Sequence, residues 1–390
     1  MRGSQPTAFL YVMVVQAPGA SNKERRASKR PPGDVIAEKP GGWHSRAMLR
    51  PGMRNLITDV DGIRVGNAED RVAWSGVTVI LPTEPALAAV DVRGGAPGTR
   101  ETDALDPTCV VDRVHAVVLS GGSAFGLDAA GAVAAELGAR GIGFAVGPAR
   151  VPIVPSAILF DLLNGGAKDW GREPPYRALA RTALAAAEGP GGSDRFALGN
   201  AGAGAGAKAG RLKGGLGSVS TVSDDGLQVG ALIAVNPLGS VVIPRSGCFW
   251  AWPFEQAGEF GGYAPPGHGI GLDADIDAAP PTAAQPGANT TIGLVATNGI
   301  LSKAEAQRVA IMAQDGFARA IRPSHTLFDG DTIFVLATGR HALAEPRPQT
   351  LAALGAIAAD CVARAVARGV YEAAPLGSLP SWRDEYGGRR

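Results

Sequence analysis

The sequence predicts an α/β protein of the α+β type, in which largely antiparallel sheets pack together and are covered by helices. Two observations favour this class. Strand-like and helix-like segments are interspersed along the 390 residues, and most neighbouring strands are joined by hairpin turns rather than by helical crossovers. With 45% apolar residues, the chain is long enough to bury a large core, in one large domain or two.

The first half of the folded region supplies strands and one helix. We expect a hairpin over 55–70 around the turn dipeptide Asp61-Gly62, followed by strands at 75–81 and 88–95. The continuous apolar run at 114–122 predicts a strand buried on both faces. It leads into an alanine-rich helix over 123–141 that ends at Gly138 or Gly141.

The second half repeats the same mixture. A helix is predicted at 176–187, and Asp225-Gly226 between two alternating runs predicts a hairpin. Strands are predicted at 291–297 and 331–339. A helix opens with the capping box of Ser302 and Glu305 and carries apolar residues at helical spacing to 321, and a last helix covers 349–371.

Composition excludes several functional classes. The formal net charge is +1, which gives no electrostatic reason to expect nucleic acid or an anionic membrane as a partner. The three cysteines, Cys109, Cys248 and Cys361, are far apart and form neither a disulfide framework nor a Cys-x-x-Cys metal site. The five histidines include no His-x-x-x-His pair, so we expect no metal and no cofactor.

The first 52 residues differ from the rest. The apolar run at 8–15 resembles a weak signal-peptide core and is too short to span a bilayer, and the segment after it is basic and linker-like. We favour a disordered or non-native extension upstream of a start at Met48 or Met53, and hence a cytoplasmic protein. A periplasmic or secreted protein is the alternative if the apolar run is a signal. No later segment has the roughly 18 consecutive apolar residues of a membrane span.

Two glycine-rich segments resemble known functional motifs. The run "GNAGAGAGAKAG" at 199–210 lacks the Gly-Lys-Ser/Thr of a phosphate loop, so a tight loop where backbones approach closely is favoured. The segment "SGGSAFG" at 120–126 lacks the G-x-S-x-G spacing of a serine-hydrolase elbow around Ser123. We expect Ser123 to cap the following helix, while Gly121, Gly122 and Ser123 remain candidates to line a substrate pocket.

The step Asn289-Thr290, at the mouth of a buried-looking strand, has three interpretations. It is a plain strand start, a glycosylation sequon, or a point of self-cleavage that leaves a reactive Thr at a new N-terminus. The sequon would place a sugar where a core strand begins, and is disfavoured. From the residues alone, the plain strand start is the simplest interpretation.

Long ordered blocks add a resemblance that covers residues 53–376. The chain resembles the self-processing L-aminopeptidase/D-esterase family (peptidase family S58), which includes β-aminopeptidases and the nylon-oligomer hydrolase. The blocks that carry the resemblance are "ITDVDGIRVG" (57–66), "DVRGGAPGTRETDAL" (91–105), "VVLSGGSAFGLDAAGAV" (117–133), "AVNPLG" (234–239), "NTTIGLVATN" (289–298) and "HTLFDGDTIFVLATG" (325–339).

The resemblance implies a fold and a processing event. The fold is a four-layer α/β/β/α sandwich, like that of N-terminal-nucleophile hydrolases but with different strand connectivity. Residues 53–390 would form a single hydrolase domain, cut between Asn289 and Thr290 into an α chain of 1–289 and a β chain of 290–390. These chains stay associated, and a homo-oligomer of such αβ units is expected.

The resemblance also assigns roles in the site. Thr290 is the nucleophile, and its new α-amine, with an ordinary pKa of about 7.7–8.0, serves as its general base. Asn236 stabilises the oxyanion, although from the residues alone an Asn-Pro turn is favoured. Asp329 and Asp331 hold the Thr290 hydroxyl and amine, or form a plain Asp-Gly-Asp turn.

The chain departs from the family pattern at two places. A family lysine in the glycine-loop region matches Arg211, so the catalytic cation is assigned to Lys213 rather than Lys208. Phe160 stands where a tyrosine lines the nylon-hydrolase pocket.

The predicted function is a self-processing amidohydrolase or aminopeptidase acting on small amides, peptides or esters with a free amine. The alternatives are a non-catalytic small-molecule-binding relative and an esterase without a peptidase role. The sequence leaves open whether α-, β- or ω-amino acyl groups are preferred.

Overall fold

The computed structural model describes residues 48–192, 194–267 and 289–388. Residues 1–47 of the predicted extension and the proline-rich segment 277–287 lie outside the described residues. The described chain opens with β1 (Leu49–Arg50), which lies inside the segment predicted to be an extension. This strand pairs with β13, so the end of that segment is part of the fold.

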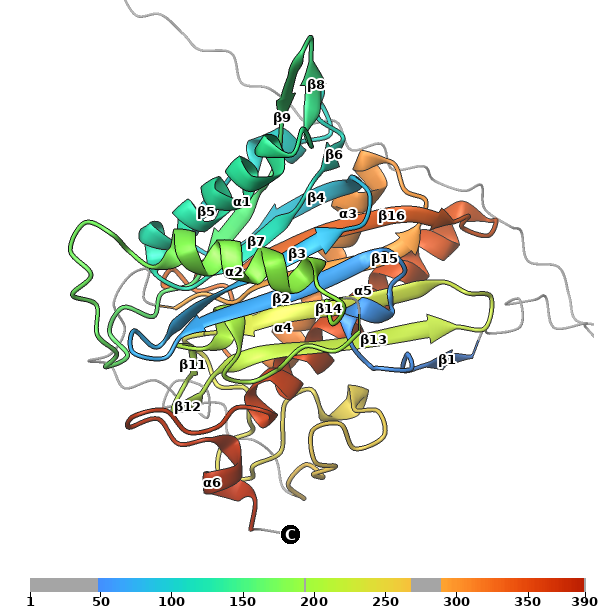
Figure 1. The fold of residues 1–390 in the computed structure, drawn as a ribbon. Helices are drawn as coiled ribbons and strands as arrows, with labels where there is room; N and C mark the ends of the chain where they lie inside the picture. The colour runs from blue at the N-terminus through green and yellow to red at the C-terminus, as the bar shows by residue number, and fades with distance from the viewer. Residues whose placement is uncertain (1–47, 193, 268–288, 389–390) are drawn as a thin grey trace, which may run out of the picture. The chain divides into compact units, whose positions relative to one another are not determined.

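The larger sheet has seven strands in the order β1-β13-β14-β15-β16-β4-β6 (Figure 1). Its neighbours are antiparallel except for β15 and β16, which run parallel. The bounds of the remaining strands are β13 (Gly215–Ser223), β14 (Gln228–Val235), β15 (Ile292–Gly299), β16 (Thr332–His341), β4 (Ala86–Val92) and β6 (Arg113–Val114).

The smaller sheet has five strands in the order β2-β3-β7-β10-β5, of which only β7 and β10 pair in parallel. Its strands are β2 (Ile63–Asp70), β3 (Ser75–Pro82), β7 (Val117–Ser120), β10 (Ser156–Ile158) and β5 (Thr99–Arg100). Two separate hairpins are formed by β8 (Phe144–Val146) with β9 (Ala149–Val151), and by β11 (Lys208–Ala209) with β12 (Leu212–Lys213).

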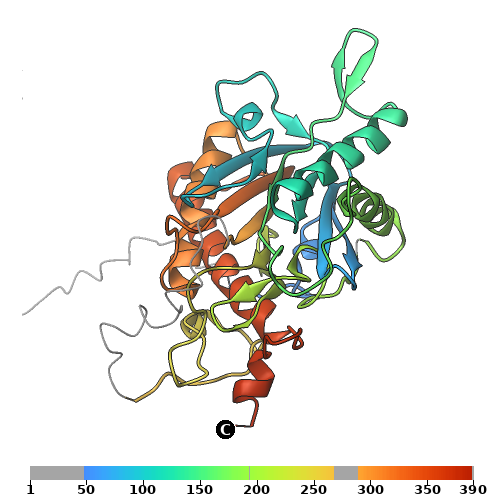
Figure 2. The same ribbon diagram turned by 90° about the vertical axis from the view of Figure 1, so that its left-hand side faces the viewer.

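Helices cover the outer face of each sheet (Figure 2). The smaller sheet is covered by α1 (Asp128–Ala139) and α2 (Tyr176–Glu188). The larger sheet is covered by α3 (Lys303–Ala313), α4 (Asp315–Ala320) and α5 (Arg347–Tyr371), and the short α6 (Trp382–Tyr386) follows. Short 3₁₀ turns are η1 (Ile57–Asp59), η2 (Asp103–Leu105), η3 (Ser123–Leu127), η4 (Gly202–Gly204) and η5 (Trp252–Phe254).

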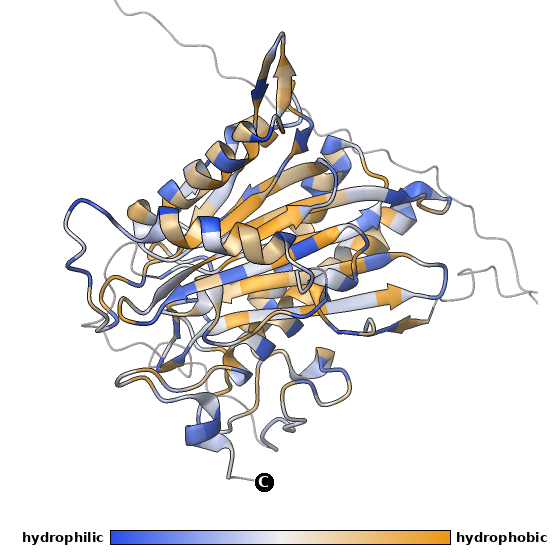
Figure 3. Ribbon diagram, in the orientation of Figure 1, coloured by the Kyte–Doolittle hydropathy of each residue, from blue (hydrophilic) through white to orange (hydrophobic). Residues whose placement is uncertain are grey.

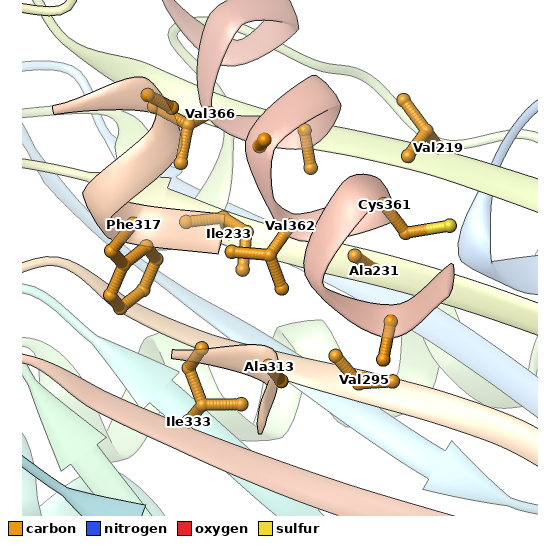
Figure 4. Packing of buried hydrophobic residues seen from close by; sticks show 14 of the residues in the cluster. Val219, Ala231, Ile233, Val295, Ala313, Phe317, Ile333, Cys361, Val362 and Val366 are labelled. Carbon is orange, nitrogen blue, oxygen red and sulfur yellow. The ribbon is translucent and has the colours of Figure 1, made fainter. Parts of the chain in front are cut away.

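Three buried clusters hold the layers together. One lies between the two sheets and includes Ile80 and Leu119 from the smaller sheet and Leu232 and Phe334 from the larger. A second joins the larger sheet to its helices, where Val362 of α5 lies over β14 and β15 (Figure 4), and a third joins the smaller sheet to α1 and α2. Apolar residues accordingly concentrate on strands such as β3, while α1 and α2 also carry polar ones (Figure 3). The predicted four-layer α/β/β/α sandwich is confirmed.

One helix tests the expectation that no segment could span a membrane. Within the described ranges, α5 is the one helix that is long and apolar enough to cross a bilayer by length and composition, and 61% of its most apolar window is buried inside the protein. It packs against β13 and β14 and against α3 and α4. Its apolar length therefore reflects its place in the core.

Two local predictions are wrong. The expected hairpin over 55–70 has only one strand, because residues 57–59 form η1, held by a hydrogen bond from the Ile57 N–H to the Ser218 hydroxyl at 2.8 Å. β2 pairs instead with β3, and the predicted turn glycine, Gly62, has a φ of 89°. Ser123 is not a helix cap: η3 begins at Ser123 itself, its cap position is Gly122, and no side-chain cap bond is formed there.

The remaining long elements lie close to their predicted positions. The hairpin at Asp225-Gly226 is formed by β13 and β14, and Ser302 and Glu305 make the expected reciprocal capping box. The helix predicted to run from 302 to 321 is divided into α3 and α4 at Gln314, whose side chain donates to the Asp91 carbonyl at 2.7 Å.

Candidate active site

The Asn289–Thr290 peptide lies just before β15. Both residues are buried, with 0% and 2% of their surface exposed. The Thr290 N–H donates to the Asn236 carbonyl at 2.7 Å, and the Asn289 carbonyl accepts from the Gly330 N–H at 3.1 Å. The Thr290 hydroxyl also hydrogen-bonds the Asn289 carbonyl oxygen, and so lies beside the carbonyl of the bond that the prediction would cut.

β14 brings Asn236 to this peptide, because it ends at Val235 and pairs with β15. The Asn236 side chain is held on both sides in the uncut chain. Its Oδ1 accepts from the Lys208 N–H at 2.9 Å, and its Nδ2 donates to the Phe160 carbonyl at 3.2 Å. Asn236 thus contacts Thr290 through its backbone, while its amide side chain connects β11 to the segment after β10.

Because β15 and β16 run parallel, the residues just before them, Thr290 and the pair Asp329 and Asp331, lie at the same end of these two strands. Asn289 and Asp329 form an isolated bridge, and Asp331 Oδ1 accepts from the Thr291 N–H at 2.9 Å. Asp329 Oδ1 accepts from the Leu238 N–H at 3.0 Å. In the uncut chain the two carboxylates therefore bind residues next to Thr290 and Asn236, rather than the Thr290 hydroxyl itself.

Burial dominates the electrostatics of this acidic pair. Asp329 and Asp331 are 0% and 1% exposed. Burial, and after it the charge of Asp331, raise the pKa of the Asp329 carboxyl above its ordinary value.

Two residues of the site were missed by the sequence analysis. His325 Nδ1 lies 2.9 Å from Asp331 Oδ2, and the His325 N–H donates to the same oxygen at 3.1 Å. The Thr326 N–H and hydroxyl donate to Asp329 Oδ2 at 3.0 and 2.5 Å. Their signal was available, since both stand in the quoted block "HTLFDGD", but a nucleophile with its own α-amine as base needs no catalytic histidine, so none was sought.

The three candidate cations have different environments. Lys213 is fully buried, and its Nζ donates to the carbonyls of Gly204 and Gly214 at 3.0 and 2.7 Å. Burial lowers the pKa of Lys213 to about 7, an effect that the Asp161 charge partly offsets. Lys208 is half-buried beside Asn236, and burial lowers its pKa too, whereas Arg211 is exposed in the turn between β11 and β12.

A buried carboxyl explains part of the glycine-rich sequence. Asp161 Oδ1 accepts from the Gly122 N–H at 2.8 Å, and Oδ2 accepts from the Ser75 hydroxyl at 2.7 Å. A Cβ on Gly121 or Gly206 would lie 2.2 or 2.7 Å from Asp161 Oδ2, so both positions need glycine. Burial raises the pKa of Asp161.

This arrangement places the predicted pocket residues. Gly121 and Gly122 lie over the Asp161 carboxyl, and the Ser123 N–H donates to the Leu159 carbonyl at 2.9 Å. Phe160 is half-buried and contacts the site through its carbonyl, which binds Asn236. In the glycine loop at 199–210, a Cβ on Gly204 or Gly206 would lie 2.1 Å from the backbone of Leu216 or Trp74, so the loop is a place of close backbone approach, as expected.

Comparison with known proteins decides the family. The profile described as Peptidase family S58 matches residues 55–379. The chain belongs to peptidase family S58. It is accordingly a hydrolase that acts on amide bonds, and the expected peptidase and amidohydrolase class is confirmed.

Relatives in sequence agree with this assignment. An uncharacterized aminopeptidase of Mycobacterium tuberculosis is 45% identical over 351 residues, which cover 86% of this chain and 98% of the relative. A 6-aminohexanoate-oligomer endohydrolase of Kocuria sp. is 32% identical over 293 residues, covering 74% of this chain and 76% of the relative.

Solved structures agree on the fold. A β-aminopeptidase of Burkholderia sp. has a TM-score of 0.63 at 22% identity, covering 88% of this chain and 97% of that one. The L-aminopeptidase D-Ala-esterase/amidase of Ochrobactrum anthropi, described as a variant of the Ntn-hydrolase fold, has a TM-score of 0.57 at 22% identity, covering 87% and 96% of the two chains.

Proposed function

We propose that the chain cuts its own Asn289–Thr290 bond and that Thr290 then acts as the N-terminal nucleophile. The substrates are small amides, peptides or esters that carry a free amine. One observation carries the proposal: the Thr290 hydroxyl hydrogen-bonds the Asn289 carbonyl, in a buried peptide held by the Asn236 carbonyl and the Gly330 N–H.

The self-cleavage proceeds in two steps. Thr290 Oγ attacks the Asn289 carbonyl carbon, the C–N bond breaks, and the hydroxyl proton ends on the Thr290 nitrogen, which leaves an ester. Water then hydrolyses the ester, which releases the Asn289 carboxylate and regenerates the Thr290 hydroxyl beside the α-amine that the first step had freed. The Gly330 N–H, already bound to the carbonyl oxygen, stabilises the negative charge that develops there.

The same groups then serve turnover. The α-amine takes the proton of the Thr290 hydroxyl as general base, the N-terminal variant of nucleophile activation. The Asn236 amide, whose Nδ2 donates to the Phe160 carbonyl, supplies an oxyanion donor once substrate displaces that bond. Asp329 and Asp331 orient the new N-terminus and attract the ammonium group of a substrate.

The architecture supports two chains that remain together. The cut falls between β14 and β15, which pair along their length, and β16 pairs with β4 on the other side. Residues 290–390 thus supply two central strands of the larger sheet, and the fragments 1–289 and 290–390 share the cores on both of its faces.

The substrate class follows from the acidic pair and from the relatives. Two buried carboxylates beside the nucleophile favour a cationic amine over a neutral or anionic end group. A relative at 32% identity is named for hydrolysis of 6-aminohexanoate oligomers, whose units carry an amine far from the carbonyl. Phe160 has no hydroxyl, so its ring can offer a substrate apolar or cation–π contact but no hydrogen-bond donor.

A pair of adjacent threonines provides a matched test. Thr290→Ala is expected to give one uncut chain without hydrolase activity, and Thr290→Ser is expected to retain cleavage because it keeps a hydroxyl. Thr291→Val is the control: it removes the neighbouring hydroxyl, whose oxygen is buried without a partner among the described residues, and should cut and hydrolyse normally.

Activity is measured on aminoacyl anilides of α-, β- and ω-amino acids, and cleavage on denaturing gels. A Thr290→Ala protein that is cut and active would contradict the proposal. If wild type is also uncut and inactive, the folded site serves for binding rather than for hydrolysis.

A further inference from the structure

We propose that His325 is a positioning residue for the hydrolase site, which acts by fixing the Asp331 carboxylate beside the nucleophile. The inference rests on the proposed function and adds a residue outside the predicted constellation. His325 binds one oxygen of Asp331 and the Thr291 N–H binds the other, so Asp331 joins His325 directly to the residue that follows Thr290.

The contacts leave the Asp331 carboxylate little freedom. Oδ2 receives the His325 ring nitrogen at 2.9 Å and the His325 N–H at 3.1 Å, while Oδ1 receives the Thr291 N–H at 2.9 Å. The Asp331 side chain is 1% exposed, and that of His325 is 22% exposed. Three donors thus set the plane of a buried carboxylate, and the histidine ring is the one side chain among them.

The two carboxylates of the site differ in their donors. Asp329 receives the N–H and hydroxyl of Thr326 and the N–H of Leu238, all of them neutral groups. Asp331 instead receives a side-chain imidazole nitrogen together with two backbone N–H groups. The ring is therefore the side-chain contact through which a substitution can alter the orientation of the Asp331 carboxylate.

The backbone at this position is unusual for a residue with a side chain. His325 has a φ of 56°, in the left-handed region that only a few per cent of non-glycine residues adopt. Such conformations persist where the surroundings hold them, and they cluster at functional sites. Here the two hydrogen bonds to Asp331 hold His325 in this conformation. The Phe317 ring packs beside it, with its centroid 6.1 Å from that of His325.

The consequence for catalysis concerns orientation. After the cut, Thr290 becomes a chain end and loses the covalent restraint of Asn289. The hydrogen bond from the Thr291 N–H to Asp331 is then a main restraint on the position of the nucleophile. This restraint is effective only if the Asp331 carboxylate is itself held in place. Because the same bond also fixes the residue after Thr290 before the cut, loss of His325 should slow self-cleavage as well as lower kcat, and it should lower kcat by more than it raises KM.

An isosteric pair of variants tests this. His325→Asn and His325→Asp have the same shape, and both residues tolerate a positive φ. The Asn amide can donate near the position of the ring Nδ1, whereas an ionised Asp cannot donate and repels Asp331. His341→Leu is the control, because His341 lies at the far end of β16 from Asp331: its carbonyl accepts from the Ile300 N–H, and its ring interacts with Asp225.

We expect His325→Asn to keep kcat within about threefold of wild type and His325→Asp to lower it by about tenfold or more, with self-cleavage slowed alongside. The Tm of each variant is measured in parallel. The inference is overturned if His325→Asp turns over like wild type, or if both variants lose activity only in proportion to lost Tm.

A replacement and a separate control cover the remaining outcomes. Should His325→Asp fail to fold, His325→Gly takes its place, because glycine tolerates the backbone conformation and only removes the donor. If Thr290→Ala is uncut and inactive while the His325 variants behave like wild type, this inference fails and the proposed function stands. A wild-type chain that neither cuts nor hydrolyses would remove both.

Discussion

Lys213 provides a quantitative prediction, because it is a fully buried lysine with an ordinary pKa of 10.5 that burial lowers to about 7. The difference between the two pKa values means that the fold favours neutral over charged lysine by about 5 kcal/mol, since each pKa unit corresponds to about 1.4 kcal/mol. The unfolded chain holds the lysine proton up to pH 10.5, and the folded chain holds it only up to about pH 7. Between these values the unfolded state binds more protons, so the Lys213 contribution makes the free energy of unfolding rise with pH.

The perturbation is Lys213→Met, which keeps an unbranched side chain and removes the titration. It also leaves the Gly204 and Gly214 carbonyls without their donor, a cost that does not depend on pH. Both proteins are made in the Thr290→Ala background, so that a single uncut chain unfolds. Other titrating groups then cancel in the difference between the two proteins.

The assay is urea unfolding followed by tryptophan fluorescence at pH 6, 7, 8 and 9. The free energy of unfolding of the lysine protein, minus that of the methionine variant, is expected to increase by about 2 kcal/mol between pH 7 and pH 9. A difference that stays constant over this range would refute the reasoning, because it would mean that Lys213 keeps its proton in the fold.

Two further predictions concern the neighbours of the site. Asn236→Ala should lower kcat by about a hundredfold or more with little change in KM, and a change confined to KM would argue against an oxyanion donor. Asp161→Ala leaves the Ser75 hydroxyl and the Gly122 N–H without their acceptor, so urea unfolding should show a loss of about 2–4 kcal/mol. An Asp161→Ala protein as stable as wild type would show that this buried carboxyl does not hold the glycine turn.

Much of the fold could be predicted because local signals agree with it. Asp225-Gly226 specifies the β13–β14 hairpin, and the capping box at Ser302 sets the start of α3. The failures occur where a tertiary contact overrides the local pattern. The alternation at 55–59 suits a strand, but the Ser218 hydroxyl takes the Ile57 N–H and holds a 3₁₀ turn.

The site was harder to predict than the fold, since its parts are distant in sequence. Nothing in the residues alone shows that β15 and β16 pair in parallel, which is what brings Asp331 beside Thr291. Asp161 was missed for the same reason, because its partners Ser75 and Gly122 are distant in sequence and only the folded chain supplies them. The burial of Lys213 was equally hidden, because lysine is a residue expected on the surface.

The central claim is tested most directly by intact mass spectrometry of the purified protein under denaturing conditions, with N-terminal sequencing of each component. The account predicts two chains, one of which begins Thr290-Thr291-Ile292. A single chain with the full mass of 39.6 kDa in an active preparation would contradict it, because Thr290 would then have no free amine with which to activate its hydroxyl.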